Sequence, residues 1–195
     1  MPTNFNDYDL IIFDADGTLR RCTVADQPCP YERGQWEVIR GVMQFITEHV
    51  PQRILLGIVS NQAPVYKGLV TERTAKQLLV DLADQAFSFC PPIDFIQLCP
   101  HQSKGSTCLC RKPQPGMLLH IMNAARKPPE RVLYVGDLPT DEEAAQNAGV
   151  HFAWAWDFFG KTKEEWVGWL GRRADEDRSR AFDERSRTAF QPKNP

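Results

Sequence analysis

Four aspartates stand where their carboxylates could act together. Asp14 ends an apolar run at 9–14, and Asp16 lies two residues later; Asp137 and Asp141 follow a second apolar run at 131–136. Carboxylates that are brought together repel one another and need a cation between them, and oxygen-only ligands favour a hard ion such as Mg²⁺. The pattern therefore predicts a magnesium site, if the fold places the ends of the two runs side by side.

A hydroxyl and a lysine accompany these acids. Ser60 and Asn61 follow the apolar run at 53–59, and Lys112 precedes an amphipathic segment at 114–126. A lysine and a hydroxyl beside a metal indicate a bound phosphate. A carboxylate can attack phosphorus to give an aspartyl phosphate, while a second acid protonates the leaving oxygen and then deprotonates the attacking water. Alone, Ser60-Asn61 is equally typical of a helix cap, and Lys112 of a surface lysine.

A second metal site is predicted at residues 99–110. Cys99-Pro100-His101 and Cys108-Leu109-Cys110 supply three thiolates and one imidazole, a closed set suited to tetrahedral Zn²⁺. Because no coordination position stays open, this zinc would be structural, and Cys3His favours zinc over iron. The alternative is that the four residues are unrelated.

The elements that must position these residues alternate along the chain. Apolar runs near 9–14, 53–59, 93–98, 131–136 and 150–155 predict buried strands, and amphipathic segments near 35–49, 71–86, 114–126, 140–148 and 163–171 predict helices. This alternation is typical of an α/β fold: a Rossmann-like, doubly wound parallel sheet in three layers. Ligands bind at the carboxyl ends of such strands, where every candidate residue except the zinc ligands is expected.

Composition limits the classes of function. The chain has 195 residues, 42% of them hydrophobic, and a formal net charge of −2, so nothing global attracts nucleic acid or an anionic membrane. It has no apolar run of roughly 20 residues that could span a bilayer. We expect a cytoplasmic monomer with a single domain over 1–170 and a charged, partly disordered tail over 171–195. The intervals between the predicted strands are too short for a separate cap domain.

The candidate residues resemble the motifs of the haloacid dehalogenase superfamily, in order, over residues 9–149. The first motif corresponds to Asp14-x-Asp16-Gly17-Thr18, the second to Ser60, the third to Lys112 and the fourth to Gly136-Asp137-x-x-x-Asp141. The resemblance implies that Asp14 is the nucleophile and Asp16 the general acid and base. It also implies that Asp14, the Asp16 backbone carbonyl and Asp137 hold Mg²⁺, with Asp141 supporting the metal or Lys112.

A narrower resemblance extends to the zinc loop. The run Cys110-Arg111-Lys112-Pro113 after the cysteines is similar to that of the heptose bisphosphate phosphatases and of the histidinol-phosphate phosphatases. It implies that Arg111 helps to grip a substrate phosphate, so that Ser60, Asn61, Arg111 and Lys112 are the predicted phosphate ligands. Ala15 departs from that branch, which usually carries arginine between the two aspartates, and residues 20–34 do not match its substrate loop.

The leading hypothesis is a magnesium-dependent phosphatase, stabilised by zinc, that acts on a small phosphorylated metabolite such as heptose bisphosphate. Histidinol phosphate and the 3'-phosphate of a polynucleotide are the alternative substrates. A hypothesis of another class is a zinc-stabilised binding protein without turnover, against which the presence of both Asp14 and Asp16 argues.

Overall fold

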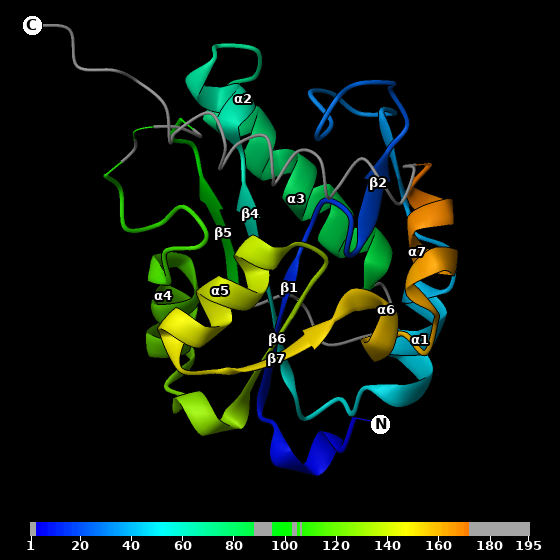
Figure 1. Cartoon of the computed structure of the whole chain (residues 1–195), viewed down its shortest axis with the longest axis vertical. Helices are drawn as coiled ribbons and strands as arrows, with labels where there is room; N and C mark the ends of the chain where they lie inside the picture. The colour runs from blue at the N-terminus through cyan, green and yellow to red at the C-terminus, as the bar shows by residue number, and fades with distance from the viewer. Residues whose placement is uncertain (1–2, 88–94, 103–104, 106, 172–195) are drawn as a thin grey trace, which may run out of the picture.

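A parallel sheet runs through the middle of the molecule (Figure 1). The computed structural model describes residues 3–87, 95–102, 105 and 107–171. Within these residues the sheet has five strands in the order β5-β4-β1-β6-β7, and all neighbouring pairs are parallel. The strands are β1 (Leu10–Asp14), β4 (Leu55–Asn61), β5 (Phe95–Cys99), β6 (Val132–Gly136) and β7 (His151–Trp154).

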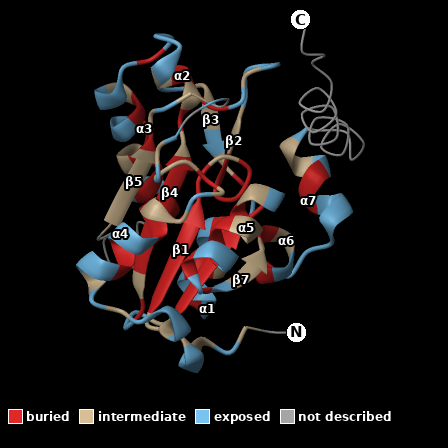
Figure 2. Cartoon of the chain, turned by 60° about the vertical axis from the view of Figure 1, so that its left-hand side comes forward, coloured by how far each residue is buried: buried red, intermediate tan, exposed pale blue. Residues whose placement is uncertain are grey.

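Helices cover both faces of the sheet and make the predicted three layers (Figure 2). On one face, Ile11 and Phe13 pack with residues of α1 (Val42–His49), α3 (Glu72–Ala86), α6 (Ala155–Phe158) and α7 (Lys163–Leu170). On the other face, Leu10 and Ile12 pack with α4 (Gly116–Ala125) and α5 (Pro139–Ala148). Because successive residues of β1 point to opposite faces, a continuous apolar run supplies both cores.

The predicted fold class is confirmed, with two local corrections. The helix predicted over 35–49 is wrong in its first part, because β3 (Trp36–Val38) pairs with β2 (Arg20–Cys22) in a small antiparallel hairpin. Gly41 has a φ of +88°, so α1 can begin only after it. The strand predicted over 150–155 ends at Trp154, and α6 begins at the next residue, Ala155.

The remaining elements are short. They are α2 (Ala63–Tyr66), directly after β4, and the turns of 3₁₀ helix at Phe5–Asp7 and Pro129–Arg131. Neither the chain between β1 and α1 nor the described chain between β4 and β5 holds a cap domain. Among the described residues no helix has the length and apolar character to cross a membrane. Except for Gly171, the predicted tail lies outside the described residues.

Candidate active site

The carboxyl ends of β1 and β6 bring the predicted acids together. The two strands are neighbours, with Phe13 paired to Val135, so Asp14 and Asp137 leave the same edge of the sheet. Carboxylate oxygens of Asp14, Asp137 and Asp141 lie within 4.8 Å of one another, and all three side chains are buried. After β1 the chain builds β4 and β5 on one side before returning to β6 and β7 on the other, and such a reversal point is where open sheets bind ligands.

Lys112 is the cation at the centre of this group. Its Nζ forms an ion pair with Asp14 Oδ1 and another with Asp141 Oδ1 at 2.7 Å. It also donates to the Tyr134 hydroxyl at 3.1 Å, which in turn donates to Asp141 Oδ1 at 2.7 Å. Only 5% of the Lys112 side chain is exposed, so a lysine that sequence alone could place on the surface is an interior charge.

Burial and charge set the protonation of these groups. Burial raises the pKa of Asp14 to about 7, an effect that the ammonium of Lys112 opposes. Burial lowers the pKa of Lys112, but the carboxylates of Asp14 and Asp141 outweigh it, and the net shift is upward. Burial and the Asp141 charge raise the pKa of Tyr134 well above its usual value. The lysine therefore stays charged and the phenol stays a hydrogen-bond donor.

Backbone geometry fixes Asp137 and Asp141. Asp141 Oδ2 accepts hydrogen bonds from the backbone N–H groups of Asp137 and Leu138, at 3.2 and 3.0 Å, at the start of α5. Asp137 accepts a hydrogen bond from the Thr18 hydroxyl at 3.2 Å. Gly17 has a φ of +101°, and a Cβ there would lie 2.2 Å from Asp137 Oδ2. Glycine is therefore required after Asp16, because only glycine readily adopts this positive φ and because a side chain would collide with Asp137.

Two predicted phosphate ligands also hold the loop that carries Lys112. The Asn61 side chain donates to the Lys112 carbonyl at 3.2 Å and accepts from the Lys112 N–H at 3.1 Å. Arg111 donates to the carbonyl of His101 at 3.3 Å. The buried Ser60 hydroxyl lies at the end of β4 and donates to Asp16 Oδ2 at 3.3 Å. Their contacts with phosphate remain predictions.

Asp16 lies outside the three-carboxylate group and has partners that sequence reasoning missed. Arg20 Nε donates to Asp16 Oδ1 at 2.8 Å, and Gln62 Nε2 donates to Asp16 Oδ2 at 2.9 Å. Arg20 and Gln62 are both almost fully buried. The available signal was an arginine four residues after an acid of the first motif. Tyr134 was missed as well; its signal was a single hydroxyl in an otherwise apolar buried strand.

The predicted zinc ligands do converge. Cys99 Sγ lies 3.5 Å from His101 Nδ1 and 3.8 Å from Cys108 Sγ, and His101 Nδ1 lies 3.2 Å from Cys110 Sγ. The ligand atoms of a tetrahedral zinc lie about 3.5–3.8 Å apart, given Zn–S and Zn–N bonds of about 2.3 and 2.0 Å. The four residues therefore have the composition and approximate spacing of a structural zinc site.

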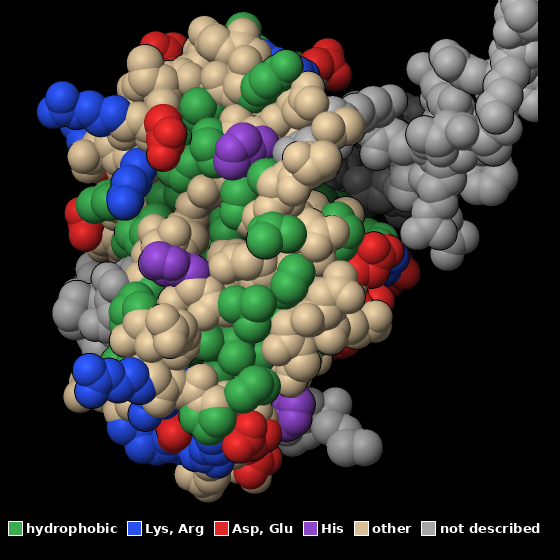
Figure 3. All heavy atoms as spheres, turned by 90° about the vertical axis from the view of Figure 1, so that its left-hand side faces the viewer, with side chains coloured by type: hydrophobic (Ala, Val, Ile, Leu, Met, Phe, Trp, Pro, Cys, Tyr) green, Lys and Arg blue, Asp and Glu red, His purple; other side chains and the backbone are tan. Residues whose placement is uncertain are grey.

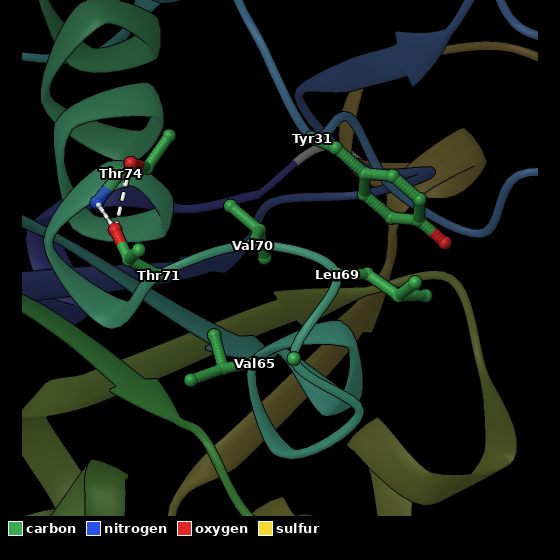
Figure 4. Close-up of a pocket in the computed structure, with 7 residues that line it drawn as sticks. Tyr31, Val65, Leu69, Val70, Thr71 and Thr74 are labelled. Atoms are coloured by element: carbon green, nitrogen blue, oxygen red, sulfur yellow. Dashed lines mark hydrogen bonds between the residues drawn. The ribbon is translucent and has the colours of Figure 1, made fainter.

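A cavity of about 510 Å³ opens beside α2, and segment 20–34 contributes Tyr31 to it (Figure 4). No charged side chain lines it; its residues are Tyr31, Val65, Gly68, Leu69, Val70, Thr71 and Thr74. On the face drawn in Figure 3, the middle is filled by hydrophobic side chains, histidines and the tan surface of backbone and other side chains, and the drawn Lys and Arg side chains lie in separate groups nearer the rim. No continuous basic surface joins these groups on the described part of that face.

Comparison with known proteins agrees with this geometry. A model of the haloacid dehalogenase-like hydrolase family matches residues 32–155. The chain belongs to this family. The match begins after Asp14 and Asp16, so it does not test the predicted roles of these two residues. The predicted membership, fold class and enzyme class, a phosphatase, are confirmed.

Individual relatives share most of the chain. The D-glycero-beta-D-manno-heptose-1,7-bisphosphate 7-phosphatase of Pasteurella multocida (strain Pm70) is 31% identical over 149 residues, 72% of this chain and 77% of the relative. The enzyme of that name from Escherichia coli (strain K12) is 32% identical over 150 residues, 72% and 74% of the two chains. A crystal structure of the D,D-heptose 1.7-bisphosphate phosphatase from B. bronchiseptica, complexed with magnesium and phosphate, superposes with a TM-score of 0.64 at 27% identity, covering 74% of this chain and 78% of that one.

Proposed function

We propose that this phosphatase depends on Mg²⁺ and hydrolyses the phosphate monoester of a sugar bisphosphate such as heptose bisphosphate, through an aspartyl phosphate on Asp14. The observation that carries the proposal is the buried group of Asp14, Asp137, Asp141 and Lys112 at one edge of the sheet. The substrate class is taken from the relatives, whose names specify heptose bisphosphate.

The chemistry of the donor set fits Mg²⁺. Lys112 pairs with two of the three buried carboxylates, Asp14 and Asp141, which leaves an excess of negative charge that a hard divalent cation would neutralise. Asp14, Asp137 and the backbone carbonyl of Asp16 would hold the ion, with Asp141 supporting Lys112. When bound, Mg²⁺ would neutralise charge on the phosphate and so favour attack by an anionic nucleophile.

The chain's own residues account for both halves of the reaction. An oxygen of the Asp14 carboxylate forms a bond to phosphorus as the ester P–O bond breaks. The leaving oxygen keeps the bonding electron pair and takes a proton from Asp16. Asp16 then removes a proton from water as the water oxygen bonds to phosphorus and the bond between phosphorus and the Asp14 oxygen breaks, which restores the Asp14 carboxylate and releases phosphate. Ser60, Asn61, Arg111 and Lys112 would hold the phosphoryl oxygens throughout.

Phosphate release from a substrate panel tests the proposal. With Mg²⁺, we expect heptose or another sugar bisphosphate to give the highest kcat/KM, and histidinol phosphate and 3'-phosphorylated oligonucleotides to give lower values. A preference for histidinol phosphate would contradict the proposed substrate class but would agree with the proposed reaction. A preference for the oligonucleotide would appear together with a strong dependence on salt. No release from any substrate, by folded protein supplied with Mg²⁺, would favour the binding-protein hypothesis.

We also propose that Cys99, His101, Cys108 and Cys110 bind a structural Zn²⁺. Burial raises the pKa of the Cys110 thiol to about 12, and the neighbouring thiols Cys99 and Cys108 add to the effect. A bound cation would reverse this by stabilising the thiolates. Since Arg111 and Lys112 directly follow Cys110, the ion would hold the loop that delivers the catalytic lysine.

Loss of one zinc ligand should therefore destabilise the protein. Cys108→Ser is expected to lose about one equivalent of zinc, measured by elemental analysis, and more than about 3 kcal/mol of unfolding free energy. Cys22→Ser is the matched control, because Cys22 is a half-buried cysteine outside the cluster. Native protein that contains no zinc after expression in zinc-supplemented medium, or equal zinc content in native and Cys108→Ser protein, would contradict the proposal.

A further inference from the structure

Arg20, at the start of β2, is a fully buried arginine whose guanidinium forms an ion pair with Asp16. Its Nε donates to Asp16 Oδ1 at 2.8 Å, and one terminal nitrogen donates to Asp16 Oδ2 at 3.3 Å. The two planar groups therefore meet side by side through two hydrogen bonds. Such a fork fixes the plane of a carboxylate as well as its distance, which a lysine cannot do.

The fold, independently of any ligand, sets the position of Arg20. Its other terminal nitrogen donates to the carbonyl of Leu78 in α3 at 3.0 Å, and its guanidinium carbon lies 5.6 Å from the centre of the Trp36 ring. The backbone closes a tight loop in which the Gly17 N–H donates to the Arg20 carbonyl at 2.8 Å. The loop after β1 thus returns Arg20 to the side of Asp16.

Asp16 Oδ2, which also accepts from Arg20, contacts the predicted phosphate ligand Ser60 as well. Gln62 Nε2 donates to Asp16 Oδ2 at 2.9 Å and to the Ser60 hydroxyl at 2.7 Å. The thiol of Cys29 donates to Gln62 Oε1 at 3.3 Å, which determines which end of the amide points at Asp16. Among the described residues, Arg20 is the one side chain that donates to Asp16 Oδ1, so this oxygen keeps a lone pair that can carry a proton.

We propose that Arg20 is a positioning residue that orients Asp16 for proton transfer to and from the reacting oxygens. The inference rests on the proposed function, in which Asp16 gives its proton to the leaving oxygen as the ester P–O bond breaks. Proton transfer requires the acid to lie within hydrogen-bond reach and in the right direction. A free aspartate side chain rotates about two bonds, whereas one held by Arg20 and Gln62 has a single orientation.

The dependence of rate on the leaving group tests this role. Nitrophenyl phosphate has a leaving group that departs without a proton, whereas glucose phosphate leaves as an alkoxide and needs one. Arg20→Met is expected to raise the ratio of kcat/KM for nitrophenyl phosphate to that for glucose phosphate at least about tenfold. Arg20→Lys, which keeps the charge but lacks the fork, should lie between Arg20→Met and the native protein.

A double-mutant cycle separates positioning from general damage to the fold. If Arg20 acts through Asp16, Arg20→Met should leave the ratio unchanged in an Asp16→Asn background. The double variant also leaves no unpaired charge in the interior, so it remains measurable if Arg20→Met alone folds poorly. Arg131→Met is the matched control, because Arg131 pairs with Asp9 at 2.8 Å near the opposite ends of the strands, and its ratio should equal the native value.

Two results would overturn the inference. The first is an equal fall in kcat/KM for both substrates in Arg20→Lys and Arg20→Met, which would indicate a structural role. The second is a further change in the ratio of kcat/KM values when Arg20→Met is added to Asp16→Asn. Both are distinct from failure of the proposed function itself, which would appear as phosphate release that survives replacement of Asp14.

Discussion

Asp14→Asn is expected to lower phosphate release by a factor of about 10⁴ or more, because the amide has no anionic oxygen with which to attack phosphorus. The substitution keeps the size of the side chain, and Lys112 keeps its ion pair with Asp141 at 2.7 Å. The free energy of unfolding should therefore change by less than about 2 kcal/mol. Phosphate release with the best substrate of the panel and urea unfolding of the same preparation measure the two quantities.

Asp9→Asn is the matched control for this variant. Asp9 lies just before β1, where it pairs with Arg131 and Lys127, far along the strand from Asp14. Its replacement should leave phosphate release within about twofold of the native rate, given the small worth of exposed ion pairs. Asp14→Asn protein that keeps more than a tenth of the native rate would show that Asp14 is not the nucleophile.

Lys112→Met should give the second largest effect, on both stability and rate. The variant would leave Asp14 and Asp141 buried beside each other without their lysine, and removing one partner of a buried ion pair costs about 3–5 kcal/mol. The rate should fall by about 10²–10³, the usual cost of losing one donor that stabilises the transition state. Added Mg²⁺ should restore part of the stability, since it would supply the missing positive charge.

Lys127→Met provides the comparison for Lys112→Met. Lys127 also pairs with an aspartate, Asp9, but at 3.7 Å and with 31% of its side chain exposed. Its loss should cost less than about 1 kcal/mol and leave the rate unchanged. Equal unfolding curves for the two variants would contradict the interior role of Lys112.

The sequence was sufficient to predict the sheet because its strands are short, continuously apolar and separated by helical segments. The same logic placed Asp14 and Asp137 at one edge, since parallel strands end together. It failed over 35–41, because Trp36–Val38 is a strand that pairs with β2 and not the start of a helix. Trp36 pairs with Cys22 and Val38 with Arg20, in a strand that comes earlier in the chain, and periodicity within one segment cannot reveal such non-local pairing.

The candidate site likewise has residues that could be predicted from sequence and residues that could not. The convergence of Asp14, Asp137 and Lys112 could be predicted because each adjoins a strand end or precedes a helix. Arg20 and Tyr134 could not, because their roles depend on side chains from other elements that meet in the interior. The double role of Asn61, which also fastens the backbone of Lys112, likewise becomes visible only when β4 and that loop are placed together.

The most direct test of phosphoryl transfer through Asp14 is to trap the phosphorylated residue. In Asp16→Asn protein, nitrophenyl phosphate should still phosphorylate the nucleophile, but the water that removes the phosphoryl group would lack its base. After acid quenching, reduction with borohydride and digestion, peptide mass spectrometry should locate the reduced acyl group at Asp14. Reduction at another carboxylate would contradict transfer through Asp14. So would nitrophenolate release with no reduced residue, under conditions that trap the aspartyl phosphate of a protein known to form one.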